Sequence, residues 1–265
     1  MRSSAPVVES RPTMTSSFAL RLERLRHALV AAVFCWGATT LPAQAPWPTS
    51  HQMATWLTTT IERPIGGGRS LWFDGNWRRM GIGADPQQIL LRPGFLWTIV
   101  EGVRAGAGYT YAATAPYGEL PTPTSLREHR LWQQIHIAYA LGDLGIQHRI
   151  RTEQRWIYPL VDGEWERPSY QNRVRFMGRG QLPTLFTVDD RRVTLFVQEE
   201  LFVNVGHGGA AARLTQNRLG AGIGVPLTPR QRLDIGYMNL WNPIPSRSAN
   251  ESNHTLTLNW VISGG

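Results

Sequence analysis

The strongest constraint on the fold of this chain is a strict alternation of apolar and polar residues, which is clearest in residues 216–241, QNRLGAGIGVPLTPRQRLDIGYMNLW. In its first half the odd positions from 219 to 227 are apolar, and the even positions from 216 to 224 are Gln, Arg or Gly. The second half keeps this parity, with one face carrying Leu233, Ile235, Tyr237 and Trp241. Side chains on a strand point alternately to opposite sides, so each half has one apolar face and one polar or glycine face. The pattern predicts a β-hairpin.

Similar alternating runs continue from about residue 52 onward, and none of them has a helical period. We therefore expect an all-β domain. The candidate strands are residues 52–63, 69–81, 88–100, 103–115, 126–142, 145–158, 170–180, 192–205, 213–227, 230–241 and 252–263. Most of them are about ten residues or longer, which is close to the length that a tilted strand needs to cross a membrane.

The connections between these runs fall into a short set and a long set. The short ones are residues 101–102, 142–145 and 228–230. The long, polar ones are residues 115–125, 159–169, 206–212 and 242–252. Short turns at one rim and long loops at the other are typical of outer-membrane barrels, so we predict a single antiparallel, up-and-down β-barrel of the transmembrane type. The connection at 181–191 is too long for the short set, and a β-bulge or a poorly paired strand end would explain it.

The predicted barrel has ten to twelve strands. The alternation gives eleven runs, whereas single-chain bacterial barrels normally have an even number of strands. Parity therefore favours ten or twelve, with the miscounted strand near residues 46–52, PWPTSHQ.

The apolar face can be followed through the whole set of runs. Beyond the hairpin it comprises Leu71, Phe73, Trp77, Ile89, Leu91, Phe95, Trp97, Ile99, Ala105, Ala107, Tyr109, Tyr111, Ile135, Ile137, Tyr139, Leu141, Ile146, Ile150, Trp156, Tyr158, Val193, Leu195, Val197, Leu201, Val203, Leu256, Leu258, Trp260 and Ile262. Trp and Tyr fall mainly near the ends of the runs, where amphipathic rings suit a membrane interface. We interpret this face as a lipid-facing belt.

The opposite face is rich in charged and amide side chains, which we assign to the barrel lumen. They are Asp74, Arg78, Arg92, Arg104, Gln134, His136, Gln147, Arg149, Arg151, Glu153, Arg155, Arg173, Arg175, Arg179, Gln198, Glu200, Arg218, Arg232 and Asp234. So many charges cannot fill a dry core, because burying unpaired ions is too costly, but they can line a wet interior. A soluble lipocalin-like barrel fits the same alternation with the two faces reversed.

The first 45 residues have the order of a secretory signal. Arg21, Arg24 and Arg26 precede the apolar run ALVAAVFCWGA and the small-residue segment LPAQA, and Met14 is an alternative start. We expect cleavage after Ala45 and a barrel domain over residues 46–265. The lone cysteine, Cys35, would leave with the leader. Export and the aromatic strand ends favour the outer membrane over the soluble alternative.

Arginine supplies all 27 basic residues of the chain, against 19 acidic ones. A composition bias explains this most simply, and because no nucleic-acid motif accompanies it we predict no nucleic-acid partner. The run at 145–158 and the next run at 170–180 each carry three arginines, and sequential strands of such a barrel are neighbours. One interpretation is a salt-bridged ladder that fills the lumen, with Glu153, Glu200, Asp74 and Asp234 as its acids. The other is a constriction that attracts anions.

Catalytic residues, metal ligands and cofactors are not predicted. His254 lies near Ser252 and Ser248, and His136 lies beside Gln134, but neither spacing shows a nucleophile with an oriented base. The seven histidines lack metal-ligand spacing. The alternate glycines at 220, 222 and 224 are expected to leave room for arginines of the facing wall.

Four segments together resemble an uncharacterised bacterial outer-membrane β-barrel family, catalogued as domain of unknown function 2490. They are EHRLWQQIHIAYALGDLGIQHRIRTEQRW, YQNRVRFM, the 216–241 hairpin and NHTLTLNWVI. The similarity runs from about Trp56 to Ile262, and its most specific part is the hairpin. The resemblance implies an outer-membrane location and a β-barrel, and it implies no activity.

The sequence thus predicts a small outer-membrane barrel that is not an enzyme. It is either a narrow channel for small anionic solutes or a plugged structural barrel, and its partners are outer-membrane lipid and such solutes. A soluble periplasmic ligand-binding barrel is the second hypothesis. A lipid-modifying outer-membrane hydrolase is the third. The pattern does not fix an oligomeric state.

Overall fold

The computed structural model describes residues 47–117, 120, 124–206 and 212–264. The predicted leader at 1–45 lies outside the described residues. Within them, no helix is long and apolar enough to cross a membrane.

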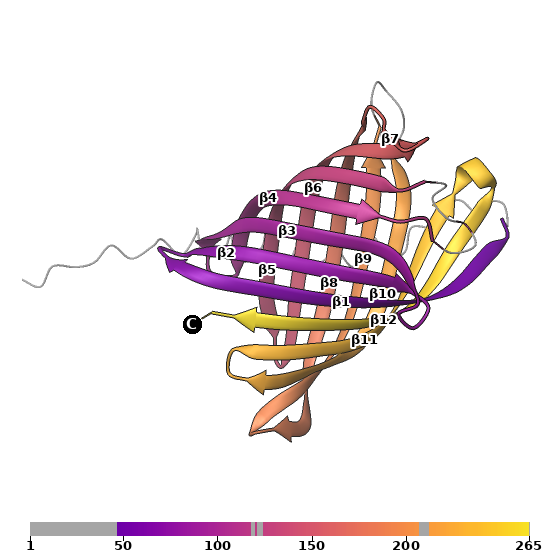
Figure 1. Cartoon of the computed structure of the whole chain (residues 1–265). Helices are drawn as coiled ribbons and strands as arrows, with labels where there is room; N and C mark the ends of the chain where they lie inside the picture. The colour runs from indigo at the N-terminus through magenta and orange to yellow at the C-terminus, as the bar shows by residue number, and fades with distance from the viewer. Residues whose placement is uncertain (1–46, 118–119, 121–123, 207–211, 265) are drawn as a thin grey trace, which may run out of the picture. The chain divides into compact units, whose positions relative to one another are not determined.

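The described residues form an all-β fold, as predicted, in which eleven long strands close into a barrel (Figure 1). These strands are β1 (Thr49–Gly66), β2 (Arg69–Met80), β3 (Asp85–Val100), β4 (Val103–Thr114), β5 (Leu126–Leu141), β6 (Leu144–Val161), β8 (Ser169–Val188), β9 (Arg191–Val205), β10 (Arg213–Thr228), β11 (Gln231–Ile244) and β12 (Ala249–Ser263). A two-residue strand, β7 (Glu164–Trp165), pairs with the end of β6. The 3-10 turn η2 (Pro245–Arg247) precedes β12.

The barrel closes through a parallel pair between its first and last strands. β1 runs beside β12 from Thr49 opposite Asn250 to Glu62 opposite Ser263. The other neighbouring strands of the barrel pair antiparallel. In an up-and-down chain every odd strand points the same way, so an eleventh strand can close the barrel only in parallel with the first. Eleven lies within the predicted ten to twelve, but the parity rule pointed to the even numbers and missed this seam.

The alternation of strand direction gives the barrel two different ends. The short-turn end carries the connections at 67–68, 101–102, 142–143, 189–190 and 229–230. The long-loop end carries those at 81–84, 115–125, 162–168, 206–212 and 245–248. The first strand begins at the long-loop end and the last strand ends at the short-turn end. The two ends of the barrel domain therefore lie at opposite rims.

The unexplained segment at 181–191 is mostly strand and not a long connection. β8 continues to Val188, β9 starts at Arg191, and the pairing register shifts between Pro183 and Thr187. A proline cannot donate to the ladder, which accounts for an irregularity at this position. The shift leaves Leu185 and Phe186 exposed, on the hairpin that extends beyond the rim in Figure 1.

The predicted apolar face is the outer face of the barrel. Its exposed members include Leu71, Trp77, Ile89, Leu91, Ile99, Tyr109, Ile135, Leu141, Ile150, Leu195, Val197, Leu219, Ile223, Leu227, Tyr237, Leu256 and Trp260. Ile146 shares their parity but is buried, with Tyr139 opposite it on β5. The polar face consequently turns inward and determines what the lumen contains.

Candidate functional site

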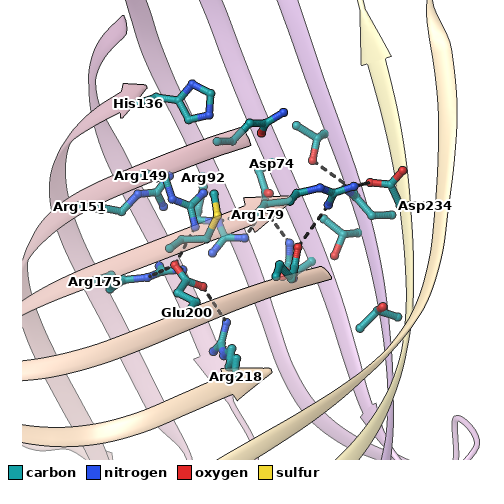
Figure 2. Close-up of a pocket in the computed structure, with 18 of the residues that line it drawn as sticks. Asp74, Arg92, His136, Arg149, Arg151, Arg175, Arg179, Glu200, Arg218 and Asp234 are labelled. Atoms are coloured by element: carbon teal, nitrogen blue, oxygen red, sulfur yellow. Dashed lines mark hydrogen bonds and ion pairs between the residues drawn. The ribbon is translucent and has the colours of Figure 1, made fainter. Parts of the chain in front are cut away.

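A cavity of about 370 Å³ occupies the half of the lumen nearer the short-turn end. Sixteen of the nineteen side chains that were assigned to the lumen line it, among them Arg149, Arg151, Arg175, Arg179, Glu200, Arg218, Arg232 and Asp234. The other three predicted residues, Glu153, Arg155 and Arg173, lie in the ion-pair network beside it. Figure 2 shows guanidinium groups from several strands pointing toward one another in this space.

Two buried glutamates hold the strands β6, β8 and β9 together. Glu153 accepts hydrogen bonds from Arg173 and from Nη1 of Arg175, the latter at 2.8 Å. Glu200 accepts from Nη2 of Arg175 at 2.8 Å and from Arg149 at 2.7 Å (Figure 2). Arg175 therefore bridges both carboxylates with its planar fork, a geometry that lysine cannot provide. Such pairing is required here because both carboxylates are buried.

A third buried carboxylate, Glu128 on β5, pairs with Arg155 and, at 2.7 Å, with Arg130. Sequence reasoning assigned Arg155 to the lumen but missed the other two residues. The signal was available, because Glu128 and Arg130 share the parity of Gln134 and His136 in the same run.

Two aspartates complete the pairing. Asp74 on β2 binds Arg92 on β3. Asp234 on β11 accepts hydrogen bonds from Arg179 at 2.8 Å and from Arg232 at 2.7 Å. Arg179 lies on β8, three strands from β11, so this pair crosses part of the lumen. All four acids of the predicted ladder are thus engaged by arginine.

Aromatic rings share the lumen with these charges, which the sequence analysis did not anticipate. Trp132 on β5 is fully buried and lies against Gly94 and Gly108, where an added Cβ would come within 2.4 and 2.3 Å of its ring. Trp72 on β2 meets it edge to face, with ring centroids 5.5 Å apart. The parity of Trp132 matched that of Gln134, but Trp132 was not among the predicted lumen residues.

The alternate glycines of β10 serve this aromatic packing. A Cβ at Gly222 would lie 2.8 Å from the Phe196 ring, and one at Gly220 would press on the adjacent strand β11. Only at Gly224 is an arginine side chain near, and it belongs to the neighbouring β11. The prediction that these glycines accommodate arginines of the facing wall was wrong, because Phe196 and the close approach of β11 take up the space.

Guanidinium groups stack on the lumen aromatics. Measured to the ring centroid, the stacked pairs are Arg78 on Trp56 at 3.6 Å, Arg179 on Phe196 at 3.9 Å, Arg218 on Phe202 at 4.3 Å and Arg151 on Trp132 at 4.6 Å. Cation–π contacts of this kind stabilise charges that are largely buried.

An apolar cluster lies in the lumen on the long-loop side of the cavity. The cluster comprises Ala54, Trp56, Met80, Met238 and Leu240. Tyr117, from the connection after β4, packs against it, and burial raises the pKa of its hydroxyl. The Trp56 indole donates to Gln87 at 2.9 Å.

Exposure rises toward the short-turn end. Glu62 and Arg104 form an ion pair at 2.5 Å close to that rim, and their side chains are 28% and 30% exposed. Arg232 is 37% exposed. Arg151, deeper in the lumen, is only 1% exposed. The side chains that line the cavity are therefore more exposed toward the short-turn end than in the middle of the lumen.

A family model described as "Protein of unknown function (DUF2490)" matches residues 53–251, which is more than half of the chain. The chain belongs to this family. The resemblance seen in the sequence is confirmed, and the DUF2490 match contains every lumen arginine named above. No curated protein and no solved structure matches the chain.

In this DUF2490 barrel, His254 and Ser252 have different hydrogen-bond partners. His254 contacts the Tyr237 hydroxyl at 2.7 Å and His51 at 3.3 Å, whereas the Ser252 hydroxyl accepts from Asn239. Within the described ranges, no three His, Cys, Asp or Glu side chains converge as a metal site requires.

Proposed function

We propose that this DUF2490 protein is a plugged outer-membrane β-barrel, in which the arginine network fastens strands that are not neighbours together and blocks conduction. The observation that carries the proposal is that side chains from strands that are not neighbours meet inside the lumen. Arg149 on β6 binds Glu200 on β9, and Trp72 on β2 packs on Trp132 on β5. The third such contact joins Arg218 on β10 to Trp56 on β1, with 4.9 Å between the guanidinium and the ring.

The outer surface supports a membrane location. It carries an apolar belt with aromatic and histidine clusters near both ends: Tyr109 and Tyr158 surround His129 toward the long-loop end, and Tyr139 contacts His148 toward the short-turn end. His129 and Tyr139 are ten residues apart on β5. At about 3.3 Å per residue and a tilt of about 40°, this corresponds to about 25 Å, the height of the apolar band in outer-membrane barrels.

The soluble periplasmic alternative requires the reverse arrangement. A lipocalin-like barrel buries its apolar face and holds its ligand among apolar side chains, with the charges in water. Here Leu71, Ile89 and Leu195 lie outside while Glu153 and Arg151 are 1% exposed within. An apolar outer surface of this extent is unfavourable in water.

A planar-bilayer recording tests the plug. With the refolded wild-type protein inserted, we expect no steady conductance steps, because the network and the apolar cluster occupy the lumen. Insertion is to be checked on the same sample by the folded-form shift of unheated protein on a gel. Steady, anion-selective steps that weaken when Arg151 and Arg173 are replaced by Ser would contradict the plug and establish the narrow channel instead.

The two different ends of the barrel give a second test, which determines the orientation of the barrel in the membrane. Residues 46–265 contain no cysteine, so a single introduced thiol can be labelled without background. Ile82→Cys lies in the turn after β2 at the long-loop end, where Ile82 is 92% exposed, and Asp143→Cys lies in an exposed short turn. Because short turns of such barrels face the periplasm, we expect a membrane-impermeant maleimide to label Ile82→Cys in intact cells. Asp143→Cys should react only after the outer membrane is permeabilised. Recovery of unlabelled barrel in the soluble periplasmic fraction would overturn the membrane location.

A further inference from the structure

The cavity has more positive charge than its own acids can neutralise. Nine arginines and four acidic residues are among the side chains that line it. The acids are Glu62, Asp74, Glu200 and Asp234. Six of the arginines form the close pairs with these acids described above. Three arginines remain: Arg78, Arg151 and Arg218.

These three guanidiniums have no close carboxylate partner in the described part of the chain. Arg151 donates twice to Gln134 Oε1, at 3.0 and 2.7 Å. Arg78 donates to the amide oxygens of Gln88 and Asn76, at 2.8 and 3.1 Å. Arg218 reaches Glu200 only at 3.8 Å. A buried charge that is hydrogen-bonded only to neutral amides costs free energy, and an anionic ligand would lower that cost.

Two of the three arginines also keep a free donor. The Nε atoms of Arg78 and Arg218 are buried and lack a hydrogen-bond partner among the described residues. Arg78 is 7% exposed, so its donor is not simply solvated. Buried donors of this kind are normally satisfied by protein, water or a ligand.

The three groups face a common space. Arg78 and Arg218 both stack on the Trp56 ring. The positive charges of Arg92 and Arg175 lie near enough to repel those of the other three arginines. These three are Arg78, Arg151 and Arg218. Figure 2 shows Arg92 from β3, Arg149 and Arg151 from β6, and Arg218 from β10 around the cavity. The convergence of like charges from separate walls is the arrangement that a multivalent anion would stabilise.

We propose that the cavity binds a small anion bearing phosphate groups, with Arg78, Arg151 and Arg218 as its principal ligands. Guanidinium forks match the oxygens of phosphate, and two or more charges on the ligand would neutralise the unpaired arginines together. The cavity volume of about 370 Å³ is large enough to hold a phosphate ester or a diphosphate. The inference does not depend on the membrane location, because the cavity lies inside the barrel in either compartment.

Thermal unfolding and titration calorimetry of the full barrel in zwitterionic detergent test this proposal, with inorganic phosphate and pyrophosphate as probes at constant ionic strength. We expect saturable binding, with pyrophosphate tighter than phosphate, and a rise in Tm with ligand concentration. Arg151→Gln and Arg78→Gln should each weaken pyrophosphate binding about tenfold to a hundredfold. Arg191→Gln, at the start of β9, is the matched control and should bind like the wild type.

A second readout separates a ligand site from a scaffold. Because Arg151 and Arg78 have no close carboxylate partner, their replacement by Gln should leave the ligand-free Tm unchanged or raise it. A scaffold role predicts a lower Tm. A lowered Tm together with unchanged pyrophosphate affinity would overturn the proposal.

The phosphate group can belong to a free solute or to a lipid. To distinguish these sources, the same proteins are inserted into vesicles of phosphatidylcholine alone or with phosphatidic acid. Stabilisation by phosphatidic acid that is lost in Arg151→Gln would identify a lipid source, and stabilisation by pyrophosphate alone a soluble one. Absence of both effects in the wild type would overturn the site, while the bilayer recording would still decide the plug.

Discussion

Replacing Glu200 by Gln is expected to lower the free energy of unfolding of the barrel by about 3–5 kcal/mol. The carboxylate of Glu200 binds Arg149 and Arg175 and lies 3.8 Å from Arg218, and Glu200 is 8% exposed. The neutral amide would leave Arg149 and Arg218 without a nearby carboxylate, and Arg175 with Glu153 alone. Equilibrium urea unfolding of the barrel refolded in phospholipid vesicles measures the change.

Glu199→Gln is the matched control for that substitution. Glu199 precedes Glu200 on β9 and points outward, where its carboxylate accepts a hydrogen bond from Asn217. The same chemical change at this position should alter stability by about 0.5 kcal/mol or less. Equal effects at positions 199 and 200 would show that the network contributes little to holding the strands together.

Pyrophosphate should restore part of the stability of Glu200→Gln if the cavity binds phosphate.

The sequence predicted the fold well because a period of two is a property of each strand alone. Strand positions, the inward and outward faces and the two classes of connection all follow from local pattern. The alternation also indicated eleven runs, but the rule that bacterial barrels have an even number of strands led away from the parallel β1–β12 seam that an odd number requires. The extension of β8 to Val188 was missed because its end, 181–191, lacks the alternation that marks the other strands.

The lumen was predictable as a set of residues but not as a set of pairs. Parity placed Arg149, Glu200 and Asp234 on the polar face. It could not show that Arg149 reaches β9 or that Arg179 reaches β11, because such contacts depend on barrel diameter and side-chain length. Trp132 and Phe196 have the parity of the polar face but were not assigned to the lumen, where strand glycines near the rings make room for them.

Trp132→Ala is expected to destabilise the barrel by about 3–5 kcal/mol, the usual cost of removing a large buried ring. Trp132 is fully buried, contacts Trp72 across the lumen and supports the Arg151 guanidinium. Its removal leaves a void where the walls of β2, β4 and β5 now meet. Urea unfolding gives the loss of stability, and Trp165→Ala on the peripheral strand β7 provides the control, with an expected change below about 1 kcal/mol.

A double-mutant cycle with Gly94 shows whether the ring itself causes this effect. A Cβ at Gly94 would lie 2.4 Å from the Trp132 ring, while its nearest backbone contact, the carbonyl oxygen of Ala107, is at 3.1 Å. Gly94→Ala should therefore destabilise the wild type by about 1–3 kcal/mol and should cost much less when Trp132 is already Ala. Additive costs would mean that Gly94 is required by the strand backbone, and the packing of Trp132 on Gly94 would then not be what closes this part of the lumen. A large coupling would establish that the plug is built by rings seated on glycines as well as by ion pairs, so that removing charge alone would not open the barrel.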